Sequence, residues 1–393
     1  MKFTLNRADA LATCTQALKT CDTKTKEVGS DADFLFTVKA GAIRVTSNCG
    51  IASQHVPLPA FVEDEEAEAE FLVPAAAITE FFKQFDSEAV ACELKETHNL
   101  LVVGSEDKAS QFAFPTLSPE NYAPMRGNIG PKSFVLDGPT LAKALSLTLV
   151  AASTNIHDTP RCAVHIVLDG DTLLVEAQDG QRMARYETAS THSFASRNEI
   201  LIPRQVAEIL AASLEKADEV TLGLGQAHVR VTWGENEMIA SLEAPLGDPF
   251  PPDLVRFFRE EPEATVVISR NDLLRKLKLA GLIAKGTYIL VTTTESGLTI
   301  SANEMDKGAS RDNVIAQTVV GESETTVGCM LLTKAVDSIE SPWVEITFRK
   351  LPNGFTALVL KDGEYEHLVC PVTANDDLGE EFEDEDGGED TDE

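Results

Sequence analysis

The sequence predicts an α+β fold built from three tandem copies of one domain, each with antiparallel sheets and two helices. Three short patterns recur in the same order, about 130 residues apart. An apolar residue precedes a helix-capping residue at Leu5-Asn6, Leu136-Asp137 and Ile268-Ser269, and strands end in proline at Pro115, Pro245 and Pro371. A repeat this long has the size of a whole domain, about 100–150 residues, whereas solenoid units have roughly 20–50.

The spacing of these patterns predicts domains at 1–127, 132–255 and 264–375, followed by an acidic segment at 376–393. The segments 118–133 and 244–264 are rich in proline and glycine, as interdomain connectors often are. We therefore expect each connector to join two complete copies of the domain.

Each copy is expected to contain a strand and a helix, then further strands, used twice. Asn6, Asp137 and Ser269 can each accept a hydrogen bond from an unpaired amide in the first helical turn. Asn6 is expected to start a helix that runs to about Thr20, and Pro74 and Pro203 are expected near the first position of the second helices. Alternating apolar residues, such as Ile43 and Val45, predict the strands.

Acidic side chains are unevenly distributed over the 393 residues, whose net charge is −31. The last 18 residues contain 12 carboxylates and no basic residue, which leaves −19 on the rest of the chain. Six acids also occur within residues 63–70. Such blocks stay solvated, so we expect loop or disorder at both places, and the end segment to serve solubility or interaction.

Several classes of protein are disfavoured by what the sequence lacks. No apolar run approaches the ~20 residues of a membrane helix, and the first residues do not resemble a signal peptide, so a cytoplasmic protein without membrane contact is expected. The seven cysteines are dispersed without a CxxC pair, which argues against a disulfide framework or a zinc site. No P-loop, GxSxG or HExxH motif is present, so we expect neither catalytic residues, nor a metal, nor a cofactor.

Four segments resemble the bacterial DNA polymerase III β sliding clamp family: MKFTLNRADAL at the start, VEAQDGQRMARYE at 175–187, ILIPRQVAEIL at 200–210 and FPPDLVRFF at 250–258. The resemblance covers about residues 1–375. It implies a head-to-tail homodimeric ring around duplex DNA, with helices lining the hole and sheets outside. Such a ring is a processivity factor, associated with the nucleoid, that binds the replicative DNA polymerase, the clamp loader and other proteins carrying clamp-binding motifs.

The resemblance also implies a cleft for partner peptides between the second and third domains. Gln181 stands where the family often has histidine, and the acidic segment follows where family chains commonly end. Methionine, phenylalanine and proline suit an adaptable apolar floor, although Met183 and Phe257 could instead pack a domain junction. The predicted cleft residues are Gln178, Gly180, Gln181, Arg182, Met183, Pro251, Arg256, Phe257, Met330, Cys370, Pro371 and Val372.

Duplex DNA should be faced by cationic residues, because contact with phosphate releases counterions. Basic residues on a single helix would indicate only an ordinary solvated face. Because basic residues recur on six predicted helices, we favour a weakly basic lining of the central hole. The predicted DNA-facing residues are Arg7, Lys19, Lys24, Lys83, Lys143, Arg204, Arg275, Lys276, Lys278 and Lys334. An acidic body suits a ring held by topology better than a protein held on DNA by charge.

Head-to-tail pairing requires the first domain of one copy to meet the third domain of another. The candidate interface residues are Ile78, Phe82, Phe112, Phe114, Leu282 and Ile283, and all six could equally be core. The alternative function is a clamp-derived, acidic mimic of DNA that sequesters clamp-binding partners. A hydrolase built on the repeat is disfavoured by the missing nucleophile and metal motifs.

Overall fold

The computed structural model describes residues 1–21, 31–243, 250–252, 254–284, 286–351 and 354–372. The chain divides into two compact units. The first unit contains Met1–Asp179 and Ala184–Pro252, and the second contains Gly180–Met183 and the chain from Asp253 onward. Three domains rich in antiparallel sheet are present, so the predicted fold class is confirmed.

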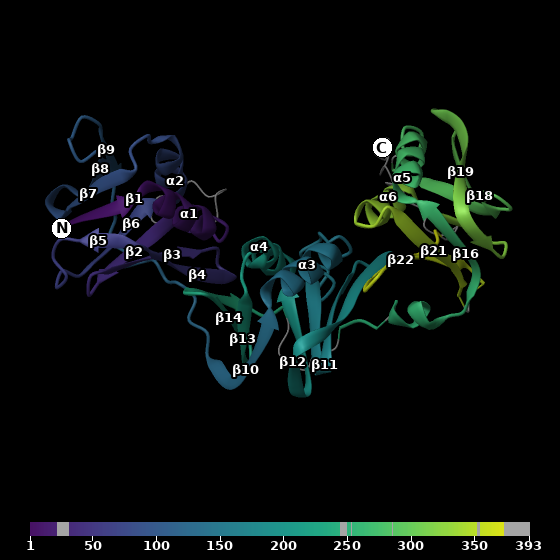
Figure 1. Cartoon of the computed structure of the whole chain (residues 1–393), viewed down its shortest axis with the longest axis horizontal. Coiled ribbons are helices and arrows are strands. Elements are labelled where there is room, and N and C mark those ends of the chain that lie inside the picture. Colours follow the sequence, from purple (N-terminus) through teal and green to yellow (C-terminus); the bar gives the residue numbers. More distant parts are fainter. Residues whose placement is uncertain (22–30, 244–249, 253, 285, 352–353, 373–393) are drawn as a thin grey trace, which may run out of the picture. The chain divides into compact units, whose positions relative to one another are not determined.

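The described residues form six α-helices, which pack in pairs. They are α1 (Arg7–Leu18), α2 (Ala75–Gln84), α3 (Gly138–Leu149), α4 (Arg204–Leu214), α5 (Arg270–Ala280) and α6 (Cys329–Asp337). The pairs α1 and α2, α3 and α4, and α5 and α6 lie side by side within their own domains (Figure 1). Two helices per domain were predicted, and the prediction is confirmed.

The three predicted helix caps are present. The Asn6 side chain accepts hydrogen bonds from the amides of Ala8 at 2.9 Å and Asp9 at 3.3 Å. Asp137 accepts from the amide of Thr140 at 2.9 Å, and Ser269 accepts from the amide of Asp272 at 3.4 Å. Each cap satisfies a donor that has no partner inside the helix.

Pro74 and Pro203 lie directly before the first helical residue, near the predicted position. Each proline ends a strand and forms the N-cap of the following helix, with φ of −54° in both cases. Neither makes a side-chain cap, because proline has no polar side-chain atom. The fixed φ of proline is compatible with both the N-cap and the first helical position, so the sequence could not separate them.

In the first unit, a five-stranded sheet belongs to domain 1 alone, and an eight-stranded sheet continues from domain 1 into domain 2. The first has the order β5 (Ala60–Val62), β1 (Lys2–Asn6), β7 (Ala89–Lys95), β8 (Leu100–Gly104) and β9 (Gln111–Pro115). The second has the order β10 (Ile129–Asp137), β13 (Glu219–Gly225), β14 (His228–Trp233), β15 (Asn236–Ser241), β4 (Ala52–Leu58), β3 (Ala42–Asn48), β2 (Asp33–Lys39) and β6 (Ala69–Pro74).

Domains 1 and 2 are joined by the antiparallel pairing of β15 with β4. In its register, Glu237 lies opposite His55 and Ala240 lies opposite Ala52. Two long strands, β11 (Ala163–Gln178) and β12 (Arg182–Pro203), complete domain 2. The first unit is therefore held together by backbone hydrogen bonds across a domain junction.

In the second unit, eight strands are hydrogen-bonded in sequence, and the helices α5 and α6 contact several of them. Their order is β23 (Tyr365–Val369), β22 (Thr356–Asp362), β21 (Trp343–Lys350), β16 (Pro262–Ser269), β19 (Gly308–Val320), β18 (Gly297–Glu304), β17 (Tyr288–Thr294) and β20 (Glu324–Gly328). Short 3-10 helices, η1 and η2, lie at Glu96–His98 and Val255–Arg259. All strand pairs with a stated register are antiparallel, as predicted.

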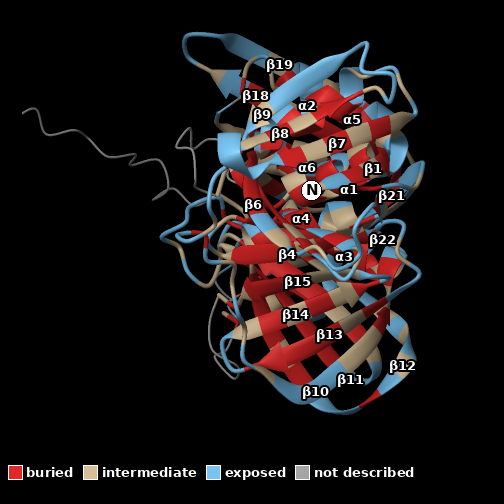
Figure 2. Ribbon diagram, turned by 90° about the vertical axis from the view of Figure 1, so that its left-hand side faces the viewer, coloured by how far each residue is buried: buried red, intermediate tan, exposed pale blue. Residues whose placement is uncertain are grey.

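Buried side chains lie between the sheets and their helices. In domain 1, Phe3, Phe34, Phe36 and Phe82 are among the largest fully buried side chains. In Figure 2 the buried positions follow the strands, whereas β19 is drawn largely as exposed. The acidic run at 63–70 forms the loop between β5 and β6 and enters β6 at Ala69, and the acidic segment 376–393 lies outside the described residues.

Candidate functional site

Several predicted cleft residues come together in the second unit. The amide of Cys370 donates to the carbonyl of Gln181 at 2.8 Å, and the amide of Val372 donates to Thr326 at 2.9 Å. Pro371 bridges Val327 at the end of β20. The loop at 180–183, the end of the last strand and the start of α6 are thereby fixed to one another.

Met330 is the apolar side chain that this arrangement leaves exposed, with 44% of its surface accessible. Met330 is the second residue of α6. Gln181, another predicted cleft residue, is also exposed. Arg256 is exposed too, and its guanidinium lies 4.8 Å from the centroid of the Phe257 ring. These three residues can contact a ligand without rearrangement.

Other predicted cleft residues have little or no surface in this structure. Met183 and Gln178 are fully buried, Arg182 is 7% exposed and Phe257 is 7% exposed. The prediction that Met183 and Phe257 form an open apolar floor is therefore wrong for this structure, because both side chains already pack inside the protein. Gly180 has φ of 90°, a left-handed backbone that explains glycine at this turn.

A buried polar group that the sequence did not predict supports the loop at 180–183. The hydroxyl of Tyr365 lies 2.7 Å from His367 Nδ1 and 2.9 Å from Ser338 Oγ, at the C-terminus of α6. Burial first, and then the nearby charge of Arg182, lower the pKa of His367 to about 3. His367 is therefore neutral at physiological pH, which avoids a second buried cation beside Arg182.

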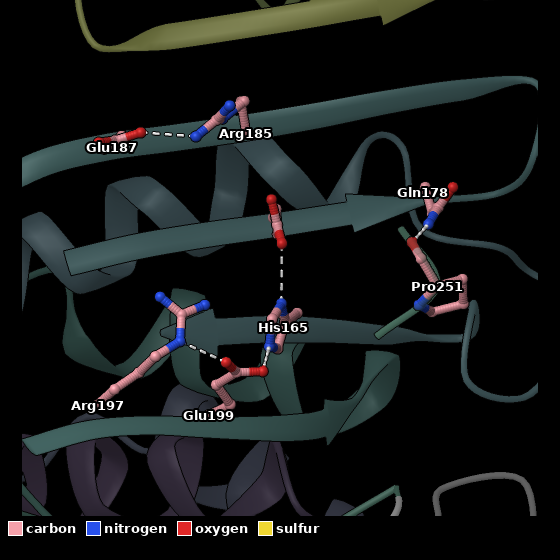
Figure 3. A network of polar contacts seen from close by, with 8 residues as sticks. His165, Gln178, Arg185, Glu187, Arg197, Glu199 and Pro251 are labelled. Atoms are coloured by element: carbon pink, nitrogen blue, oxygen red, sulfur yellow. Dashed lines mark hydrogen bonds and ion pairs between the residues drawn. The ribbon is translucent and has the colours of Figure 1, made fainter. Parts of the chain in front are cut away.

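In the first unit, the connector after domain 2 is bound by β11. The side-chain amide of Gln178 donates to the carbonyl of Pro251 (Figure 3). The ring of Phe250, which is 6% exposed, stacks on His165 with centroids 4.8 Å apart and planes 16° from parallel. Pro251, a predicted cleft residue, is thus held at a defined position on domain 2.

His165 lies between two carboxylates. Its Nδ1 is 2.9 Å from Glu176, and its Nε2 makes an ion-pair contact of 3.3 Å with Glu199 (Figure 3). Arg197 binds Glu199 from the other side at 2.6 Å. Burial opposes the ionisation of Glu199, but Arg197 and His165 outweigh it and lower its pKa.

The helices carry most of the predicted DNA-facing residues. Nine basic and five acidic side chains lie on the six helices, a net of +4 in a chain of net −31. The exposed basic residues among those predicted are Lys83, Lys143, Arg275, Lys278 and Lys334. Lys83 and Arg275 have acidic neighbours one turn away, at 3.7 Å and 3.0 Å.

Arg7 and Arg204, both predicted to face DNA, each bind the end of a neighbouring helix. Arg7 donates to Phe82 in the last turn of α2 at 3.2 Å, and Arg204 donates to Leu149 at the end of α3 at 3.0 Å. Arg270, which the sequence did not single out, donates to Asp337 at the end of α6 at 2.8 Å. Carbonyls at a helix C-terminus lack partners and attract cations, so each arginine joins the two helices of its domain.

Two predicted DNA-facing lysines are also engaged within the protein. Lys19 donates to the carbonyl of Ala212 in α4 at 2.8 Å, and burial lowers its pKa. Lys276 forms an ion pair with Asp312 at 2.5 Å and is half-buried. Lys24 lies outside the described residues.

Ile78 and Phe82 are core residues, so their assignment to the interface is wrong. They are 1% and 0% exposed and belong to the core of domain 1. Phe112 is 52% exposed on β9, at the edge of its sheet, and Phe114 is half-buried two positions later. Leu282 is 76% exposed just after α5, and Ile283 is half-buried.

Phe112 and Phe114 line a groove of about 1000 Å³ beside α2. Phe81 lies at its centre, with ring centroids 5.2 Å from Phe112, 5.8 Å from Phe114 and 4.7 Å from Phe85. The rim is acidic and contains Glu80, Asp86, Glu106 and Asp107.

The surface of α5 is basic, in contrast to the acidic groove of domain 1. Leu279 and Leu282 are exposed there, at 45% and 76%, and share a shallow groove of about 460 Å³ with Arg275 and Lys278. Leu279 was not predicted, although its position three residues before Leu282 could have indicated it.

Among the described residues, no group of three or more histidine, cysteine, aspartate or glutamate side chains is placed to hold a metal ion. In the same part of the chain, no helix is long and apolar enough to span a membrane.

Comparison with known proteins gives consistent matches. Residues 1–126 match the family model described as DNA polymerase III beta subunit, N-terminal domain. The beta sliding clamp of Pseudomonas aeruginosa is 23% identical over 256 residues, which cover 64% of this chain and 68% of that protein. The beta sliding clamp of Micrococcus luteus is 23% identical over 319 residues, which cover 80% and 98%.

Solved structures agree on the fold over nearly the whole chain. The DNA polymerase III beta subunit of Thermotoga maritima superposes with a TM-score of 0.84 at 20% identity, covering 95% of this chain and 99% of that one. A sliding clamp of Pseudomonas aeruginosa bound to griselimycin gives 0.83 at 20% identity, with 95% and 99% covered. The threefold repeat, the paired helices and these matches together support a divergent member of the bacterial β sliding clamp family.

Proposed function

We propose that two copies of this chain form a closed ring around duplex DNA and act as a processivity factor that tethers a DNA polymerase. The observation that carries the proposal is the junction between domains 1 and 2, where β4 of one domain pairs with β15 of the next. In a chain of repeated domains, the same pairing can be made wherever equivalent edges are free.

Two such edges are unpaired on one side within the described residues. Strand β9 is the last strand of its sheet and is equivalent to β15. The first half of β19 pairs only with β18 and is equivalent to β4. Exposed edge strands readily pair with another chain, so the repeat favours pairing of β9 in one copy with β19 in the other.

The known junction also gives the register of this pairing. The strand pairs β7–β8 and β8–β9 of domain 1 correspond to β13–β14 and β14–β15 of domain 2, and following their paired residues makes Gln111 equivalent to Glu237. In the same way, the pair β3–β4 corresponds to β18–β19, which makes Ala52 equivalent to Gly308. Transferring the register of β15 and β4 places Phe112 opposite Ser310, Ala113 opposite Ala309 and Phe114 opposite Gly308. Large aromatic residues would thus meet small ones.

The surfaces beside these edges have matching chemistry. The aromatic groove of domain 1 has an acidic rim, and the leucine surface of α5 carries Arg275 and Lys278. Such charge complementarity orients two partners and speeds their association. We expect Leu279 and Leu282 of one copy to enter the groove of the other.

Binding of DNA is supported by the sign of charge on the helices. Their net of +4 contrasts with the acidic remainder of the chain. A ring does not need tight phosphate contacts, because topology retains it, and weak contacts allow sliding.

The test is retention on DNA of defined topology. The protein is incubated with a clamp loader, ATP and nicked circular DNA, and the circle is then linearised. A sliding clamp should be lost on linearisation. Two outcomes would favour the acidic mimic that sequesters partners. One is that the protein stays on the DNA after linearisation, and the other is that it is not retained on circles and inhibits the loader.

We further propose that Gln181, Arg256, Met330 and the chain at 370–372 bind partner peptides, and that griselimycin is a usable probe of this site. Met330 is exposed beside segments fixed by hydrogen bonds, so a bound ligand would find an ordered apolar contact. Met330→Asp should weaken griselimycin binding by about tenfold or more. Met305→Asp is the matched control, since Met305 is 99% exposed in the turn between β18 and β19.

A further inference from the structure

We propose that the acidic segment 376–393 binds the surface of α5 in its own copy, and that ring closure must displace it. This α5 surface consists of Asn271, Leu274, Arg275, Lys278, Leu279 and Leu282. The competition with ring closure rests on the proposed function, because the same surface is proposed to enter the groove of domain 1 in the second copy. The binding of the segment to α5 does not depend on the ring.

The α5 surface offers apolar side chains and positive charge at one place. Leu279 is 45% exposed and Leu282 is 76% exposed, beside a groove of about 460 Å³. Lys278 is exposed and forms no ion pair within the described part of the chain, whereas Arg275 pairs with Asp272 at 3.0 Å. A ligand that carries both apolar and acidic side chains would gain from burial and from charge at the same time.

The acidic segment carries that combination of side chains. It contains 12 carboxylates and two apolar residues, Leu378 and Phe382, each with acids before and after it. The groove of domain 1, which is proposed to receive the same surface, likewise combines phenylalanine side chains with an acidic rim. The segment and the groove would therefore present the same chemistry to α5.

Hydrogen bonds hold the chain before the segment close to α5. The amide of Val372 donates to the carbonyl of Thr326 at 2.9 Å, in the strand that leads into α6. Three residues later, Cys329 begins α6, and its thiol donates to the carbonyl of Leu277 on α5 at 3.8 Å. Figure 1 shows the two helices side by side. Val372 is therefore within about 20 Å of α5, whereas the ten residues that end at Phe382 span up to about 33–36 Å when extended.

Tethering allows a weak contact to compete with a second copy. A short flexible linker gives the attached segment an effective concentration of about 1 mM. A segment that binds α5 with a dissociation constant of about 0.1–0.3 mM would then occupy most of the monomers. A second copy must displace it, which weakens the apparent affinity of the dimer by about fourfold to tenfold.

Zero-length cross-linking of the full-length protein tests the binding to α5. A carbodiimide joins a carboxylate to an amine that touches it, and mass spectrometry of the monomer identifies the lysine joined to 376–393. We expect Lys278 to be joined at least about tenfold more often than Lys307 or Lys334, because apolar burial acts only at α5. Both control lysines are exposed in the same unit. Equal yields at the three lysines would overturn the proposal, since charge alone would then attract the segment.

A variant that keeps every charge separates specific binding from general attraction. Leu378→Ser with Phe382→Ser retains all 12 carboxylates and removes only the apolar contacts. Its yield at Lys278 should fall to that of Lys307 and Lys334. A yield at Lys278 as high as in the wild type would overturn the proposal.

Analytical ultracentrifugation of the same two proteins tests the competition with ring closure. The dimer dissociation constant should be about fourfold to tenfold lower in the serine variant than in the wild type. Both proteins have a net charge of −31, so a change in repulsion between copies cannot explain the difference. An unchanged constant would overturn the competition. If neither protein forms a dimer, the proposed ring fails, and the yield at Lys278 still decides whether the segment binds α5.

Discussion

Single side chains that look alike in the sequence have separate roles in the structure. Arg204 and Lys334 were both predicted to face DNA, yet Arg204 donates to the carbonyls of Leu149 and Ala152 at 3.0 Å and 2.7 Å, whereas Lys334 is exposed on α6. The partners of Arg204 are more than 50 residues away in the chain. Sequence patterns report local neighbours, so this long-range contact could not be predicted.

Arg204→Ala should therefore reduce stability more than DNA binding. Loss of a charged donor leaves helix carbonyls unpaired and should cost about 1.5–3 kcal/mol in the free energy of unfolding. Lys334→Ala should leave the urea midpoint of unfolding unchanged but reduce the slope of log affinity against log salt by about 1 on duplex DNA. A large effect of Arg204→Ala on that slope, with stability unchanged, would restore its DNA-facing role.

His367 should make the second unit sensitive to acid. Its pKa is lowered to about 3 by burial and by Arg182, so the unfolded chain binds a proton below about pH 6.5 that the folded protein refuses. Stability from this site is present in full above that pH and is lost as the pH falls toward 3. At pH 4.5 the loss should be about 2–3 kcal/mol.

The measurement compares urea unfolding of the wild type and His367→Gln at pH 7 and pH 4.5. Glutamine does not titrate, so the variant should lose less stability between the two pH values. His98→Gln is the control, since His98 is exposed on η1 and should not alter the pH dependence. Parallel curves for His367→Gln and the wild type would show that His367 accepts a proton in the folded state.

At the scale of helices and strands, the sequence predicted elements well and their faces less well. Asn6, Asp137 and Ser269 could be recognised because a cap binds amides two or three residues away. Ile78 and Phe82 could not be assigned, because a core face and an interface face have the same apolar period. Only the packed structure shows that α2 buries these two residues and leaves the Phe81 groove beside them.

The edge strand β9 and the end of α5 should control self-association. Phe112→Asp or Leu282→Asp places a charge in an apolar contact and should weaken the dimer by at least about 30-fold, as expected of a central interface residue. Light scattering at micromolar concentration should then report the 42.5 kDa monomer. Phe61→Asp is the control, because Phe61 is 70% exposed on β5, at the opposite edge of the same sheet.

For the whole molecule, the repeat predicts more than composition does. The net charge of −31 was compatible with both a clamp and a DNA mimic, and nothing in it decides between them. The ladder partners, in contrast, specify which residues should meet between copies. Sequence alone could align Val45 with Ile300 but could not show which strand edges remain unpaired, since that depends on the folded sheets.

The ring can be tested by closing it covalently. The transferred register places Ala113 of one copy opposite Ala309 of the other, both exposed on their strands. Directly opposed residues in antiparallel strands have Cβ atoms about 4.5–5.5 Å apart, close enough for a disulfide after a small adjustment. The double variant Ala113→Cys with Ala309→Cys should form intermolecular disulfides under mild oxidation, whereas either single variant should not.

A pairing shifted by two residues supplies the matched control. Ala113→Cys combined with Arg311→Cys keeps the side chains on the same face but moves them about 7 Å out of register, so cross-linking should be at least tenfold slower. Oxidised after loading on a nicked circle, the Ala113 and Ala309 variant should stay on the DNA in high salt, because counterion release cannot free a closed ring. Linearising the circle should release it. If the shifted pair cross-linked faster, the register transferred from domains 1 and 2 would be wrong, and if salt alone removed the oxidised protein from circles, the chain would not enclose DNA.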